Sequence, residues 1–146
     1  MICDEETKIV DGEKRFQHFF SMISATPGTY HPVVVENVKS RRIIGAGTLI
    51  VEQKFIHEAA VRSRIEDVYV TSEYRDQGIE SLVTEALSVY AEKLGCYKVN
   101  LAAPLHAVAR CEQLGLVHEP GQNVMVVPIP SNVDVAATTV NNKSML

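Results

Sequence analysis

Cysteine is scarce in this sequence, and its three residues, Cys3, Cys96 and Cys111, stand at unrelated spacings. No CxxC pair occurs, and no cysteine and histidine cluster has the spacing of a zinc site. The pattern disfavours a disulfide scaffold and a metal centre. It predicts reduced thiols in a cytoplasmic protein without a bound metal.

Long apolar runs and clustered positive charge are also missing. No stretch approaches the roughly 20 apolar residues that span a bilayer, and the N-terminal MICDEETK is acidic where a signal peptide would be basic. The net charge is -4, and the lysines and arginines are scattered. These absences disfavour membrane insertion, secretion and nucleic-acid binding.

The length of 146 residues suits one domain with one sizeable core. We assign residues 1–130 to that domain. Residues 131–146 have no hydrophobic periodicity and few large apolar side chains, so we expect an irregular C-terminal tail there.

Hydrophobic periodicity predicts the element order helix, three strands, helix, strand, helix, strand. In the first helix, Phe16, Phe19, Phe20 and Ile23 share one apolar face. Strands are expected at 32–37, 42–56, 65–70, 97–103 and 124–129, and the later helices at 78–94 and 105–115. This order predicts an α/β (α+β) domain with a mixed sheet covered by helices.

The turn YRDQGIES connects the strand IEDVYV to the second helix. A helix N-terminus offers four N–H groups without intrahelical partners and about half a positive charge, which favours a phosphate. Arg75 adds a cation, and Gly78 allows a ligand to approach the backbone. The turn is therefore a candidate diphosphate site, although glycine also occurs in any tight structural turn.

Together with its flanking elements, this turn resembles the Arg/Gln-x-x-Gly-x-Gly/Ala signature of the GNAT superfamily of N-acetyltransferases. The words KFIH, IED and GCYK, in this order, resemble more closely the eukaryotic glucosamine-6-phosphate N-acetyltransferases, over residues 16–127. The resemblance implies a GNAT fold with a mixed, mostly antiparallel sheet and helices on both faces. It also implies acetyl-CoA as a substrate, an amino-sugar phosphate as acceptor, and a homodimer. The first strand of the family has no counterpart among the predicted elements.

The resemblance further implies roles for individual residues. Glu66 and Asp67 would contact the acceptor amine and sugar, while Lys54 and His57 would lie on the acceptor side, where a sugar phosphate needs cations. The cofactor would be bound by the backbone of Val68 and Val70 and by the turn residues Arg75, Gln77, Gly78, Ile79 and Ser81. Cys111 stands where the family has the tyrosine that protonates the coenzyme A thiolate.

Three features depart from the family pattern. Glu80 replaces a glycine or alanine, and a carboxylate about 5 Å from a phosphate would repel it by roughly 3 kcal/mol at an effective dielectric constant near 20. Alternatively, Glu80 turns to solvent, as acidic residues in first helical turns commonly do. Cys111 is either a proton donor or a small core thiol. Ala102, Ala103 and Ala107 replace polar residues of the family.

The sequence therefore leads to one main hypothesis, an N-acetyltransferase in which the acceptor amine attacks the thioester directly. A catalytically inactive paralogue, acting as a structural or regulatory dimer partner, is the alternative that the three departures favour. An acetyltransferase with a changed acceptor is a third hypothesis.

Overall fold

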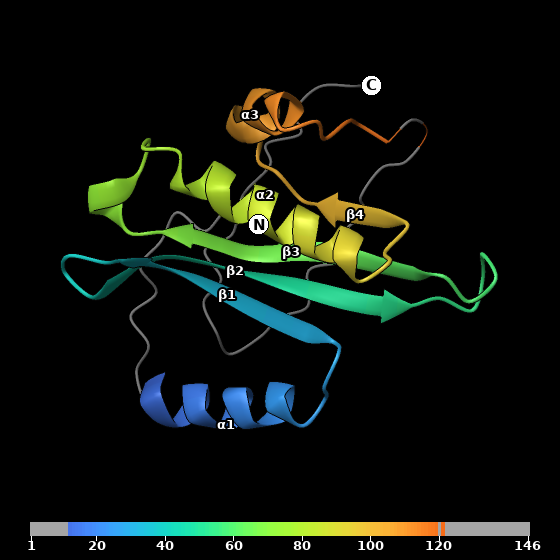
Figure 1. The fold of residues 1–146 in the computed structure, drawn as a ribbon, viewed down its shortest axis with the longest axis horizontal. Helices are drawn as coiled ribbons and strands as arrows, with labels where there is room; N and C mark the ends of the chain where they lie inside the picture. The colour runs from blue at the N-terminus through green and yellow to red at the C-terminus, as the bar shows by residue number, and fades with distance from the viewer. Residues whose placement is uncertain (1–11, 120, 122–146) are drawn as a thin grey trace, which may run out of the picture.

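The structure is a computed structural model that describes residues 12–119 and residue 121. Four strands form one sheet, and the helices lie around it (Figure 1). In chain order the elements are α1 Gly12–Ser24, β1 Tyr30–Asn37, β2 Arg42–Gln53, β3 Val61–Val70, η1 Ser72–Tyr74, α2 Ile79–Lys93, β4 Lys98–Leu101, η2 Leu105–Ala107 and α3 Val108–Gln113.

The sheet is mixed, with strand order β1-β2-β3-β4. The first three strands pair antiparallel, and β4 pairs parallel to β3. A parallel neighbour requires a crossover connection, which α2 supplies. This topology confirms the predicted α+β class with a mixed, mostly antiparallel sheet.

Two strand boundaries differ most from the prediction. β3 begins at Val61 instead of Ile65, because Ser63 and Ile65 are fully buried and alternate with polar residues on the other face. β2 ends at Gln53 instead of continuing to Ile56. The backbone N–H of Lys54 bonds to the carbonyl of Ala60, which closes the connecting loop at that point.

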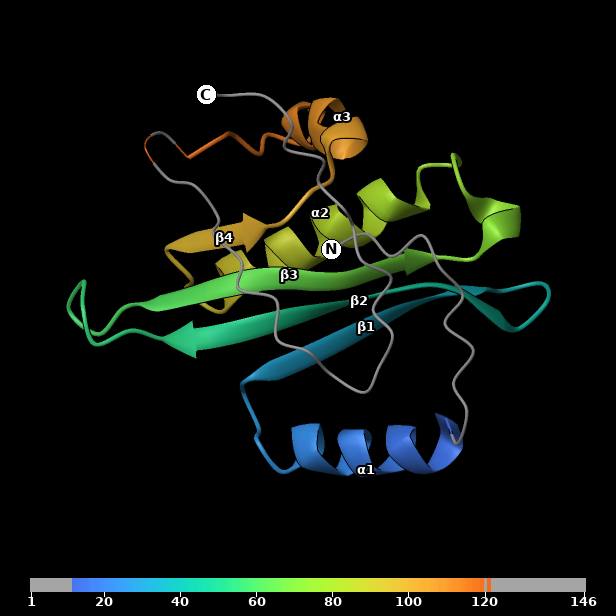
Figure 2. The same ribbon diagram turned by 180° about the vertical axis from the view of Figure 1, so that it is seen from behind.

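The core lies between α2 and one face of the sheet (Figures 1 and 2). It contains six fully or almost fully buried side chains, Leu49, Ile65, Val68, Val83, Leu87 and Ala91. Gly47 permits the close approach of helix and sheet, since a Cβ there would lie 2.6 Å from Cγ1 of Val83. Of the apolar stripe that the sequence predicts for this helix (Leu82, Val83, Ala86, Leu87, Tyr90 and Leu94), Val83 and Leu87 are buried and the others are exposed, while Thr84 and Ala91 complete the buried face of α2.

The apolar face that the sequence predicts for α1 is largely exposed. α1 lies beside the β1 edge in both views (Figures 1 and 2). Phe16, Phe19 and Phe20 are 62%, 55% and 51% exposed. The helix exists where periodicity places it, but its aromatic face has no covering within residues 12–119.

The remaining elements are shorter than predicted. β4 covers four residues of the expected 97–103, and the segment expected as one helix at 105–115 divides into η2 and α3. The strand expected at 124–129 and the tail at 131–146 lie outside the described residues. Across the part of the chain that the structure describes, no helix has the length and apolar character needed to cross a membrane.

Candidate active site

The sheet opens at the point where β3 and β4 separate. These strands pair only between residues 62–65 and 98–101. Asp67 has a φ of 54° and lies in a β-bulge, where the pairing with β2 shifts. From Asp67 to Val70, the edge of β3 that would face β4 therefore has no neighbouring strand among the described elements.

This opening presents backbone rather than side chains to a ligand. Val68 and Val70 are 0% and 3% exposed, because their side chains belong to the core. Only their main-chain groups remain for binding, which agrees with the role implied for them. An extended ligand arm can add to such an edge by strand-like hydrogen bonds.

The turn before α2 lies at the end of the same strand. Gly78 is the N-cap of α2 in the left-handed conformation, with φ 80°, and no described side chain caps this helix end. A Cβ at Gly78 would have no described atom within 4 Å, so the backbone is open to approach there. These features fit a diphosphate at the helix N-terminus.

The other residues of the turn make different contacts. Nε of Arg75 lies 3.5 Å from the carbonyl oxygen of Val70, and the amide of Gln77 donates to the carbonyl of Glu73 at 3.0 Å. Ile79 packs inward against the core. Arg75 is therefore held close to the end of β3, beside the open edge.

Glu80 adopts neither of the two arrangements expected from the sequence. Its side chain is 19% exposed, and it accepts a hydrogen bond from Nη1 of Arg110 at 2.5 Å. Nη2 of Arg110 lies 3.7 Å from the carboxylate of Asp76, which is 89% exposed. Glu80 is thus neutralised by a cation from α3 instead of turning freely to solvent.

A small pocket lies between α2 and the η2–α3 segment. Its lining is Glu80, Ser81, Thr84, Leu101, Ala107, Arg110, Cys111 and Leu114. Burial raises the pKa of the Cys111 thiol, an effect that the nearby Arg110 opposes. The thiol is therefore protonated at neutral pH and has a proton to donate. Ala107, which stands in η2 where the family has a polar side chain, is buried.

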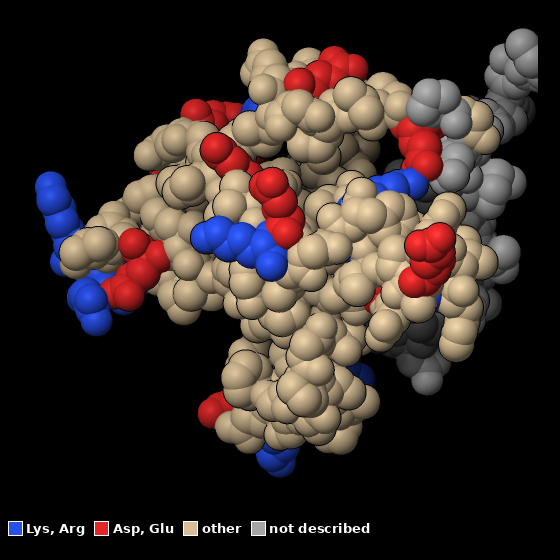
Figure 3. Space-filling model, turned by 45° about the vertical axis from the view of Figure 1, so that its right-hand side comes forward, with Lys and Arg blue, Asp and Glu red and all other residues tan. Residues whose placement is uncertain are grey.

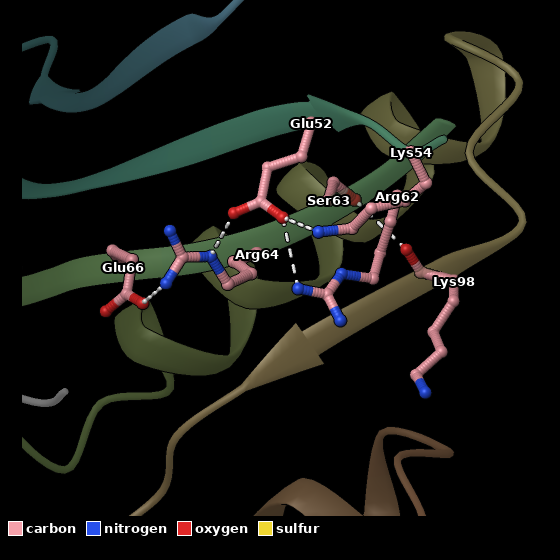
Figure 4. Close-up of polar contacts among 7 residues, drawn as sticks. All are labelled: Glu52, Lys54, Arg62, Ser63, Arg64, Glu66 and Lys98. Carbon is pink, nitrogen blue, oxygen red and sulfur yellow. Dashed lines mark hydrogen bonds and ion pairs between the residues drawn. The ribbon is translucent and has the colours of Figure 1, made fainter. Parts of the chain in front are cut away.

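Two of the acceptor-side residues, Lys54 and Glu66, lie in a charged cluster on the sheet face opposite α2 (Figure 4). We call Glu52, Lys54, Arg62, Arg64 and Glu66 the Glu52 network. The carboxylate of Glu52 lies 2.5 Å from Nζ of Lys54, 3.1 Å from Nη2 of Arg62 and 2.9 Å from Nε of Arg64. Nη1 of Arg64 is also 3.6 Å from Glu66. The network thereby connects Lys54 with Glu66.

The hydrogen bond from Lys54 lowers the pKa of Glu52, and Arg62 and Arg64 lower it further, against the opposing effect of burial. His57 lies outside the network. It is exposed, has a φ of 55° and stacks at a tilt on Tyr97 with ring centroids 5.4 Å apart. The structure therefore joins Lys54, but not His57, to Glu66 on β3.

Sequence reasoning missed Glu52, Arg62, Arg64 and Arg110. The first three carried a signal, since charged residues alternate along the two paired strands, but residues 61–64 were expected to be a link instead of a strand. Arg110 carried none, because its contact with Glu80 connects positions 30 residues apart. No group of three or more His, Cys, Asp or Glu side chains within the described ranges is arranged to hold a metal.

Opposite charges lie close to one another over the visible surface. Figure 3 shows the blue and red side chains interspersed on this face, without a broad field of one sign.

Comparisons with known proteins point to one family. The model of the acetyltransferase (GNAT) family matches residues 2–116. A probable glucosamine 6-phosphate N-acetyltransferase of Drosophila melanogaster is 41% identical over 104 residues, which are 71% of this chain and 47% of that protein. Glucosamine 6-phosphate N-acetyltransferase 1 of Dictyostelium discoideum is 34% identical over 89 residues, 61% of this chain and 57% of that protein. The chain thus spans about half the length of these relatives.

A solved structure supports the same relationship. The glucosamine-6-phosphate N-acetyltransferase of Arabidopsis thaliana superposes with a TM-score of 0.72 at 25% identity, covering 85% of this chain and 83% of that one. The family model covers most of the chain, and the splayed strands with the uncapped α2 N-terminus occur in the segment that it matches. The chain therefore belongs to the acetyltransferase (GNAT) family.

Proposed function

We propose that this chain transfers the acetyl group of acetyl-CoA to the amino group of glucosamine 6-phosphate. The observation that carries the proposal is the opening between β3 and β4, which ends at the uncapped N-terminus of α2. The open edge suits the pantetheine arm, and the helix N-terminus suits the diphosphate. The names of the relatives support the amino-sugar phosphate as acceptor.

The chemistry requires a neutral amine, a polarised carbonyl and a proton for the leaving thiolate. The amine nitrogen forms a bond to the thioester carbon, the carbon–sulfur bond breaks, and one proton leaves the nitrogen while another reaches the sulfur. Glu66 and Asp67 lie at the bulge beside the opening and orient the amine. Cys111 retains a proton at neutral pH and delivers it to the thiolate.

Lys54 supplies positive charge on the acceptor side. Its ammonium is held by Glu52, and the two neighbouring arginines of the Glu52 network make this region cationic overall, with three cations against two carboxylates. A sugar phosphate would experience a net attraction there. His57, exposed on the same loop, provides a further donor.

The decisive experiment combines binding with turnover in the purified chain. We expect calorimetric titration to detect coenzyme A, and mass spectrometry to detect N-acetylglucosamine 6-phosphate formed from acetyl-CoA and the amino sugar. If coenzyme A binds and another amine is acetylated while this product is not formed, the acceptor is that amine and not glucosamine 6-phosphate. No binding up to millimolar concentration would reject the activity and favour the inactive paralogue.

We expect Cys111→Ala to lower kcat about 10- to 100-fold while leaving coenzyme A affinity nearly unchanged, since a general acid acts on the chemical step. Cys96→Ala is the matched control, because this thiol packs against the core instead of lining the pocket. Steady-state kinetics with both variants measure the difference. Equal kcat values for Cys111→Ala and the unmodified protein would assign the thiol to packing alone.

We also propose that the chain works as a homodimer. The exposed phenylalanines of α1 and the outer edge of β1 support this, since that edge has no partner strand among the described elements. An apolar face and an unpaired strand edge are both surfaces that a second copy can cover. Light scattering after size-exclusion chromatography measures the mass. A monomer at micromolar concentration would contradict the proposal.

A further inference from the structure

The pairing of Glu80 with Arg110 links the cofactor turn to α3. Glu80 is the acidic residue in the first turn of α2, and Arg110 lies in the second turn of the η2–α3 segment. Their side chains meet at 2.5 Å, and Arg110 also faces Asp76. One guanidinium therefore lies between the two carboxylates closest to the open backbone at Gly78.

The charges at the turn balance only when Arg110 is counted. Asp76 and Glu80 contribute two negative charges, and Arg75 contributes one positive charge. Without Arg110 the turn would carry a net negative charge where an anion has to bind. With it the sum is zero, and the dipole of α2 then favours a diphosphate.

Arg110 also has donors to spare. A guanidinium presents five N–H groups in a rigid fork. In this structure one terminal nitrogen donates to Glu80, and the other lies at 3.7 Å from Asp76. The side chain is 42% exposed and lines the pocket together with Ser81. It can therefore hold Glu80 and meet an incoming phosphate oxygen at the same time.

We propose that Arg110 is a cofactor-binding residue that neutralises Glu80 and contacts the coenzyme A diphosphate, restoring an anion site that Glu80 alone would spoil. This inference rests on the proposed function. It means that α3 supplies positive charge at the turn. It also explains Glu80, which departs from the family pattern, as the ion-pair partner of Arg110. Glu80 in turn restrains Arg110, so Glu80 lowers the affinity that Arg110 creates.

The two residues then predict changes of opposite sign. Arg110→Met should raise the dissociation constant of coenzyme A about tenfold or more, since it removes a charge-assisted contact and exposes the turn to Glu80. Glu80→Gln should lower it about threefold to tenfold, because Arg110 is released toward the ligand. Arg110→Lys should fall between the unmodified protein and Arg110→Met, since it keeps the charge but loses the fork.

Lys93→Met is the matched control. It removes one positive charge at the opposite end of α2, roughly 20 Å away at 1.5 Å per residue, so it should leave the affinity unchanged. Calorimetric titration with coenzyme A at low and moderate salt measures all four variants, and circular dichroism checks that they fold. The tighter binding expected of Glu80→Gln is an effect that misfolding cannot produce.

The outcomes separate this role from the proposed function. Equal affinities in the unmodified protein, Arg110→Met and Glu80→Gln would overturn the role and leave the acetyltransferase proposal standing. Tighter binding in Arg110→Met would also overturn it, because the pair would then block the turn. If no form of the protein binds coenzyme A, the proposed function fails and the role fails with it.

Discussion

We expect the replacement of Gly78 by alanine to weaken coenzyme A binding about tenfold or more, a change of about 1.4 kcal/mol or greater. Gly78 has a φ of 80° and forms the uncapped N-terminus of α2. An added Cβ would contact no described protein atom, so it would project into open space beside the proposed diphosphate site. The loss arises because the methyl group obstructs the approach of the ligand to the backbone.

Gly28→Ala is a close control for the backbone strain. Gly28 has a φ of 83°, and a Cβ added there would likewise meet no described atom, but this glycine lies in the connection between α1 and β1. A residue with a side chain costs roughly 1–2 kcal/mol in this conformation, and both variants should show that loss in urea denaturation. Only Gly78→Ala should lose affinity in calorimetry. Unchanged affinity would mean that Gly78 serves the turn and not a ligand.

The elements of this fold were predictable where periodicity was strong. Val83 and Leu87 of the apolar stripe predicted for α2 lie in the core, although Leu82, Tyr90 and Leu94 of the same stripe are exposed. β-branched runs placed β1 and β2 correctly within a few residues. These patterns succeed because the core accepts apolar side chains at only one spacing for each type of element.

The first half of β3 could not be recognised in this way. Arg62 and Arg64 alternate with buried Ser63 and Ile65, so the strand has a charged face and a core face that includes a serine. The polar residues 61–64 were therefore interpreted as a connecting loop between two strands. The Ser63 hydroxyl lies near the carbonyl of Lys98, at 3.4 Å, which gives this buried polar group a partner in β4.

The candidate site was predictable in position but not in electrostatics. The turn, its glycine and the strand before it follow from the sequence and from the resemblance to the family. The partner of Glu80 does not, because ion pairs between distant segments depend on the packing of α2 and α3. The exposure of the apolar face of α1 could not be predicted either, because helical periodicity identifies an apolar face without saying what covers it.

Replacing Glu52 by glutamine should lower the free energy of unfolding by about 2–4 kcal/mol at pH 7. The substitution leaves three cations, Lys54, Arg62 and Arg64, around a neutral amide on the sheet surface. Removing one member of a buried ion pair costs about 3–5 kcal/mol, and the 24% exposure of the Glu52 side chain reduces this. Urea denaturation measures the loss.

The effect should depend on pH in a definite direction. The folded-state pKa of Glu52 lies below its ordinary value of 4.5, mainly because Lys54 donates to it. A depressed carboxylate pKa adds stability that is fully present above about pH 4.5 and is lost as the pH falls through the folded-state pKa. The difference between the unmodified protein and Glu52→Gln should therefore shrink as the pH falls below about 4.5.

Glu36→Gln is the control for this loss of stability. It tests whether the loss is specific to the Glu52 network or follows the removal of an ordinary ion pair. Glu36 pairs with Arg41 at 2.9 Å, but both side chains are exposed, so its removal should cost at most about 1 kcal/mol. Similar losses for the two variants would mean that the Glu52 network behaves as an ordinary surface pair. A larger, pH-dependent loss for Glu52→Gln would show that the network stabilises the pairing of β2 with β3. Because Arg64 holds Glu66 within the same network, the variant should then also raise the KM for the acceptor.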